Sequence, residues 1–153
     1  MKRVAAALLA LGLVLLLAGC GGAAKSADLS AVKEALAAQY DLTGLMELSE
    51  DDLLDMYGIQ SGDLAQRVAL VARTSTSADE ILLFEAKVAD SAARVKQKAE
   101  ARYQAKLNEA KDYLPDEYAK ISACKVEASG NYVALIVSSD AEAMMKAYRA
   151  AFK

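Results

Sequence analysis

Ser129-Gly130-Asn131-Tyr132-Val133-Ala134-Leu135-Ile136-Val137 is the stretch of the sequence that decides the fold. Its last six residues form the most strand-like run in the chain, because β-branched and aromatic side chains are enriched in strands. The serine, glycine and asparagine before this run are typical turn residues. We therefore expect a β-hairpin whose two strands cover residues 120–127 and 131–138.

A second hairpin is expected upstream of the first. Residues 66–73 and 80–88 are short apolar runs, and the polar segment 74–79 joins them. The segment Ser77-Ala78-Asp79-Glu80 also matches a capping box, which would begin a helix that runs into the next one. We favour a strand for residues 80–88 and keep the helix as the alternative.

Helical spacing of apolar residues predicts four helices. Two precede the hairpins, at residues 28–40 and 49–58, and one follows each hairpin, at 90–114 and after 139. Residues that favour helix starts and stops lie at their ends. These are Asp28, Ser49 with acids at 50–52, Gly58, Pro115 and the capping box Ser139-Asp140-Ala141-Glu142.

Each hairpin needs a cover for its apolar face, and the helix that follows it can supply one. The sequence therefore predicts an α+β fold with two N-terminal helices and then a ββαββα arrangement. The four strands would form one antiparallel sheet with the helices packed on one face. This single domain is expected to cover residues 28–153.

The first 19 residues have the three parts of a signal peptide. Two basic residues come first, residues 4–18 are apolar, and Leu17-Ala18-Gly19-Cys20 has the pattern of a bacterial lipobox. The apolar run is shorter than the roughly 20 residues that a transmembrane helix needs. We expect cleavage between Gly19 and Cys20 and lipidation of Cys20. A plain secretory signal is the alternative.

A chain processed in this way would be anchored by acyl chains at the extracytoplasmic face of the cell membrane, with the bilayer as its partner. Residues 20–27 would form the lipidated cysteine and a flexible tether. Loss of Lys2 and Arg3 leaves 16 basic residues against 21 acidic ones, a net charge of −5. This acidity argues against nucleic acid as a partner.

No catalytic residue, metal site or cofactor is expected from the residue types. Histidine, the commonest general base and metal ligand, is absent. Cys124 is the only thiol besides Cys20, and in the expected strand 120–127 it would be a small buried side chain. The acidic group at 50–55 lacks the spacing of a calcium loop and fits the start of a helix.

A basic row lies beside the apolar row of the long helix. Arg94, Lys98, Arg102 and Lys106 recur every four residues, so a helix places them on one side. At a membrane, this row is a candidate contact for lipid head groups or an anionic wall polymer. The alternative is a solvated face balanced by nearby acids.

Five short motifs follow one another along most of the chain. They are Tyr57-Gly58-Ile59, Ala78-Asp79-Glu80-Ile81, Arg102, Asp112-Tyr113-Leu114-Pro115 and Gly130-Asn131-Tyr132-Val133. With these motifs in this order, the chain resembles a family of bacterial lipoproteins known as domain of unknown function 4358. The resemblance implies an envelope lipoprotein, and it implies no activity because the family has no established function.

The leading functional hypothesis is a membrane-anchored, non-catalytic module that binds a protein or polymer of the cell envelope. One alternative is an envelope enzyme that acts on glycan through a pair of carboxylates. Another is a single-domain solute-binding lipoprotein with a pocket between sheet and helices. Sequence spacing alone does not show whether acids or pocket walls converge in space.

Overall fold

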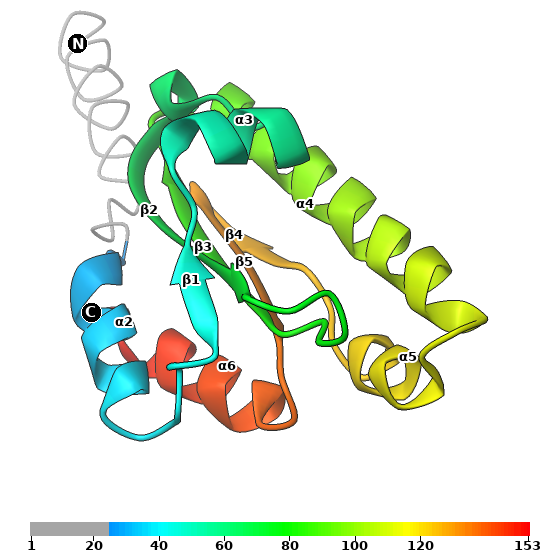
Figure 1. The fold of residues 1–153 in the computed structure, drawn as a ribbon. Coiled ribbons are helices and arrows are strands. Elements are labelled where there is room, and N and C mark those ends of the chain that lie inside the picture. The colour runs from blue at the N-terminus through cyan, green and yellow to red at the C-terminus, as the bar shows by residue number, and fades with distance from the viewer. Residues whose placement is uncertain (1–24) are drawn as a thin grey trace, which may run out of the picture.

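An antiparallel sheet of five strands is the centre of the part of the chain that the structure describes, residues 25–153 (Figure 1). The structure is a computed structural model. The strands lie side by side in the order β1-β2-β3-β5-β4. They are β1 (Leu45–Glu47), β2 (Leu64–Ala72), β3 (Glu80–Ala86), β4 (Glu127–Ser129) and β5 (Tyr132–Val137).

The upstream hairpin is confirmed. β2 and β3 pair from Leu64↔Ala86 to Val71↔Glu80, so the helical alternative for residues 80–88 is wrong. β5 lies between β3 and β4, and all six of its residues are buried. The strand-like run Tyr132–Val137 therefore lies in the interior of the sheet, where buried strands are continuous apolar runs.

Helices cover both faces of the sheet, so the expectation of helices on one face is wrong (Figure 1). One face, with Leu83 and Ile136, packs against α2 and α6. The other face, with Phe84 and Leu135, packs against α3, α4 and α5. The physical reason is that β3 and β5 are apolar on both sides. The helices are α2 (Leu29–Ala37), α3 (Glu50–Tyr57), α4 (Ala89–Lys111), α5 (Pro115–Ser122) and α6 (Ala141–Ala150), with a 3₁₀ turn at Ser61–Asp63.

The downstream hairpin is shorter than expected, because α5 takes the first three residues of the expected strand 120–127 and β4 begins only at Glu127. Pro115 begins this helix instead of only ending the previous one, since a first helical position needs no N–H. Glu117 and Lys120 then lie one turn apart on α5. Glu117 accepts a hydrogen bond of 2.7 Å from the N–H of Ala78, just before β3, which ties the helix to the sheet.

Cys124 consequently lies in the loop between α5 and β4 and not in the middle of a strand. Its side chain is buried, and its thiol donates to the carbonyl of Lys120. Burial raises the pKa of this thiol. Within residues 25–153 it forms no disulfide. The expected role as a small buried side chain therefore fits, although its strand position was wrong.

The strand β1 was not expected from the sequence. It has three residues and pairs with β2 from Leu45↔Ala72 to Glu47↔Leu70. Such a short edge strand has no apolar alternation of its own, so only its partner defines it. It makes the sheet five-stranded where four strands were expected.

The helix ends follow the expected caps at Asp28, Ser49 and Gly58 but not at residues 139–142. Asp28 accepts from the N–H groups of Ser30 and Ala31, and Ser49 forms a reciprocal capping box with Asp52. Gly58 ends α3 with φ +64°, a conformation that favours glycine. The expected capping box at 139–142 does not form: Asp140 precedes α6, and its side chain makes no capping bond.

No helix within residues 25–153 combines the length and the apolar character needed to span a bilayer.

Burial of β5 in the core leads to a prediction about stability. Leu135→Ala should lower the free energy of unfolding by about 2–5 kcal/mol, because Leu135 is fully buried and its loss leaves a cavity. Leu54→Ala is the matched control, since this leucine is 45% exposed and should change stability by only about 0.5 kcal/mol. Urea unfolding of both variants measures the difference. Equal losses would contradict the assignment of β5 to the core.

Candidate functional site

The predicted basic row divides into an outer and an inner half. Arg94 is exposed and forms an ion pair of 2.5 Å with Asp63. Lys98 is also exposed, and its ammonium lies so close to Gly58 that a Cβ there would be 3.1 Å from it. A cation at this position is favourable, because α3 ends there with unpaired carbonyls. Arg94 and Lys98 line a hollow of about 520 Å³ between the end of α3 and α4.

The inner half of the row points to one buried carboxylate. Glu80, the first residue of β3, is fully buried. The Lys106 ammonium lies 3.1 Å from Oε2 of Glu80, and the Arg102 Nε lies 3.6 Å from Oε1. The hydroxyl of Tyr57 donates a hydrogen bond to Oε1. We call Tyr57, Glu80, Arg102 and Lys106 the ionic cluster.

The ionic cluster is held mainly by charge. Oε2 of Glu80 and Nε of Arg102 are buried without a hydrogen bond of good geometry, although cations or anions lie near both. The Lys106 ammonium finds a further acceptor in the carbonyl of Ala78 at 2.9 Å. The Arg102 guanidinium also lies 5.3 Å from the centre of the Tyr57 ring. The cluster thus joins α3, β3 and α4.

Burial raises the pKa of Tyr57, and the negative charge of Glu80 beside it raises this pKa further. Tyr57 therefore stays protonated and remains a donor to Glu80. Because the Glu80 carboxylate is fully buried, a substrate in solution does not reach it. We interpret the ionic cluster as a structural link and not as a reaction centre.

Tyr57, Glu80 and Arg102 each belong to a different motif of the family resemblance, and they meet in this cluster. Arg102 and Lys106 were candidate contacts for an anionic partner, with a solvated face as the alternative, and their charges point toward Glu80. A contact with such a partner would rest on Arg94 and Lys98. A buried acid opening a strand, as Glu80 does, is a signal that could have indicated this cluster.

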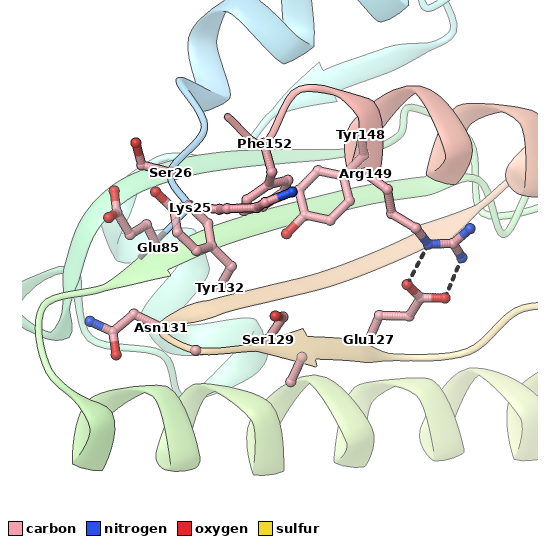
Figure 2. Close-up of a pocket in the computed structure, with 12 residues that line it drawn as sticks. Lys25, Ser26, Glu85, Glu127, Ser129, Asn131, Tyr132, Tyr148, Arg149 and Phe152 are labelled. Carbon is pink, nitrogen blue, oxygen red and sulfur yellow. Dashed lines mark hydrogen bonds and ion pairs between the residues drawn. The ribbon is translucent and has the colours of Figure 1, made fainter. Parts of the chain in front are cut away.

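A pocket of about 810 Å³ lies on the face of the sheet that α2 and α6 cover (Figure 2). It is found where this cover ends, over β4 and the adjoining ends of β3 and β5. Residues from the sheet, from α6, from the segment just before α2 and from the C-terminal end surround it. They are Lys25, Ser26, Glu85, Glu127, Ser129, Asn131, Tyr132, Tyr148, Arg149 and Phe152, together with Ala128 and Gly130.

The strand register explains the floor of this pocket. Glu85 pairs with Tyr132, and Tyr132 pairs with Ser129, so their side chains form one row across three strands. On the other side of Glu85, the row continues to Gln66 of β2, whose amide donates to the Glu85 carboxylate at 2.6 Å. Sequence patterns missed this row because it joins residues far apart in the chain.

The N-terminal segment is fastened beside the pocket. Ser26 exchanges two backbone hydrogen bonds of 3.2 Å with Lys153. The N–H of Ala27 donates to the Tyr132 hydroxyl, and the carbonyl of Ala27 accepts from the Gln66 amide. Ser26 and Ala27, at the end of the segment 20–27 that was expected to be a tether, are therefore bonded to the fold.

One ion pair lies at the edge of the pocket. Arg149 of α6 donates two hydrogen bonds of 2.9 and 2.5 Å to the carboxylate of Glu127 (Figure 2). These bonds lower the pKa of Glu127, so this carboxylate stays ionised near neutral pH. Burial raises the pKa of Tyr148, whose hydroxyl makes no hydrogen bond to any residue that the structure describes.

The other predicted residues have simple positions. The acids at 50–52 are exposed at the start of α3, as expected for a helix N-terminus. Within residues 25–153, no group of three or more acidic or cysteine side chains could hold a metal ion. The predicted cleavage and lipidation residues, Gly19 and Cys20, lie outside the described residues.

The family described as Domain of unknown function (DUF4358) matches residues 38–138. The chain belongs to this family. The DUF4358 region contains the whole ionic cluster and all five strands, whereas Tyr148, Arg149 and Phe152 of the pocket follow it. Neither the curated proteins nor the solved structures contain a match to the chain.

The ionic cluster makes a prediction for stability. Glu80→Gln should lower the free energy of unfolding by about 3–5 kcal/mol, because it leaves buried Lys106 without its counter-charge. Glu80→Gln combined with Lys106→Met should recover most of this loss. The control is Glu47→Gln, which breaks an exposed pair with Lys33 and should cost about 1 kcal/mol or less. Similar losses for Glu80→Gln and Glu47→Gln in urea unfolding would contradict the cluster.

A second prediction concerns alkaline pH. The pKa of Tyr57 is raised in the folded chain, so folding holds this proton to higher pH than the unfolded chain does. Its contribution to stability is complete below about pH 10, the ordinary tyrosine pKa, and is lost progressively above it. Tyr57→Phe should therefore reduce the loss of stability measured between about pH 9 and 11.

Tyr113→Phe is the matched control for this measurement, since Tyr113 is 85% exposed. It should keep the pH dependence of the wild type. If Tyr57→Phe and the wild type lose stability in parallel above about pH 10, the phenol of Tyr57 is not coupled to folding.

Proposed function

We propose that the chain is a lipoprotein, anchored through acylated Cys20 at the extracytoplasmic face of the cell membrane, and a non-catalytic binding module of the cell envelope. One observation carries the proposal: Ser26 is bonded to the backbone of Lys153 and lines a pocket of about 810 Å³. Only residues 21–25 separate that point from Cys20 in the sequence. The predicted anchor and the pocket are therefore neighbours.

The lipobox pattern at residues 17–20 supports the anchor. Each acyl methylene that enters the bilayer contributes about 0.8 kcal/mol, so two or three chains hold a small domain firmly. Five extended residues span at most about 18 Å, so the pocket would lie near the membrane surface. An envelope protein or polymer close to the membrane would be the partner.

The state of the pocket acids supports binding over catalysis. Glu127 is ionised and accepts two hydrogen bonds from Arg149, so it is poorly suited to act as a general acid. Glu85 accepts a hydrogen bond from Gln66. A carboxylate pair for glycan cleavage would need one acid with a raised pKa and the other free to act as nucleophile or base.

Solute binding is the second candidate function, and the pocket volume favours it. Pockets that hold small ligands have volumes of about 300–1,000 Å³, and this one falls within that range. Such a site would need no second domain, because the sheet and α6 already provide two walls. The two candidate functions share the anchor and differ in the size of the partner.

The anchor has a direct test in cells that produce the full-length chain and are fed an alkyne-bearing fatty acid. The wild-type chain should carry the label and sediment with membranes, and Cys20→Ala should lose the label and leave the membrane fraction. Cys124→Ala is the matched control and should keep both properties. Label that persists in Cys20→Ala would show that the attachment, if any, is elsewhere.

A further inference from the structure

We propose that the pocket between α6 and β4 binds the acyl chain of a lipid drawn from the bilayer. This inference rests on the proposed membrane anchor and adds the class of ligand. It assigns the site to Tyr132, Tyr148 and Phe152, which form its apolar wall, with Arg149 and Glu127 at one end (Figure 2). The occupant is a membrane lipid and not the anchor of the protein itself.

The apolar wall of the pocket is suited to an apolar ligand. The ring of Phe152 stands edge-on to Tyr132 at 4.8 Å and to Tyr148 at 5.1 Å, with interplanar angles of 84°. Through these edge-on contacts, three aromatic side chains from β5, α6 and the C-terminal end form one surface. An aromatic wall of this kind favours an apolar group over a fully hydrated one.

The pocket is already formed by contacts within the protein itself. Tyr132 is held through Ala27, and the C-terminal end is held by the backbone pair of Ser26 and Lys153. The bidentate pair of Arg149 and Glu127 fixes the far end of the wall. A flexible chain that enters such a pocket loses its own entropy, but the protein loses little more.

The polar groups of the pocket fit a lipid ester better than an ionic ligand. Two cations, Lys25 and Arg149, and two anions, Glu85 and Glu127, line the pocket, so it has no net charge that would select an ionic ligand. The hydroxyl of Tyr148 is a donor without a partner among the described residues. The ester carbonyl of a lipid is an acceptor of the kind that this hydroxyl needs.

The proposed anchor would hold the pocket close to the lipids of the bilayer. A tether of at most about 18 Å keeps the pocket in a thin layer over the membrane, where lipid is always present at high effective concentration. Weak intrinsic affinity is then sufficient for occupancy. The same pocket on a chain released from the membrane would stay largely empty.

The experiment uses full-length chain in cells that incorporate a diazirine-bearing fatty acid into their phospholipids. After irradiation, the protein is purified from membranes and the adducts are mapped by mass spectrometry. We expect a lipid adduct on the peptides that carry Tyr132 or Tyr148 and Phe152. Ser129→Trp, which places a large exposed side chain in the pocket, should lower this adduct at least about tenfold.

Ser75→Trp is the matched control, because Ser75 is exposed in the loop between β2 and β3, at the opposite end of the strands. It should keep the wild-type adduct. Circular dichroism checks that both tryptophan variants are folded. Ser129→Ala is a second control, because this small side chain should leave the adduct unchanged.

Three outcomes would overturn the inference while leaving the anchor intact. They are an acylated, membrane-bound chain without pocket adducts, an adduct that Ser129→Trp does not lower, and a crosslink that joins the pocket to the acyl group of Cys20. A chain that carries no acyl group and does not sediment with membranes would instead overturn the proposed function itself.

Discussion

Burial of the two central strands on both sides is the constraint on which the rest of the structure depends. Every residue of β5 is buried, and β3 is buried at all positions except Glu85. A sheet with such strands needs a cover on each face. α4 with α3 and α5 covers one face, and α2 with α6 covers the other. The second cover stops short of β4, and the pocket lies there.

The same constraint explains the ionic cluster. Glu80 begins β3 and is carried into the interior by the apolar residues that follow it. A buried carboxylate is costly unless cations neutralise it, and Arg102 and Lys106 of α4 do so. Burial and charge pairing thus place α4 across the sheet at one defined position. This is a structural use of residues that, on the sequence, read as a surface row.

Local patterns in the sequence were sufficient where a single element decided the outcome. The periodicity of Leu29, Val32 and Leu36 predicted α2, and the turn before Tyr132 predicted the β4–β5 connection. The cap of Gly58 was also readable, because only a few residues accept a left-handed conformation. These features depend on neighbours within a few positions of the chain.

The rest depended on contacts between distant residues. α5 was not predicted, and its residues 120–122 were assigned to a strand, because its link through Glu117 to Ala78 is invisible in a local window. β1 exists through its pairing with β2, and the pocket floor exists through the register of three strands. The direction of Arg102 and Lys106 was hidden for the same reason. The sequence predicts the anchor, and the structure shows a pocket beside Ser26, six residues after Cys20 in the sequence.

We propose from the predicted anchor and from the position of the pocket beside Ser26 that the pocket end of the molecule faces the membrane. The most direct measurement uses full-length acylated protein in bilayer nanodiscs that contain lipids with a quencher on their head groups. A fluorophore on Ser129→Cys, in a Cys124→Ala background, is compared with one on Ser122→Cys in α5, which lies far from α2 and the C-terminal end (Figure 1). The account predicts strong quenching at position 129 and weak quenching at position 122. Equal quenching at the two positions, or stronger quenching at 122, would contradict it.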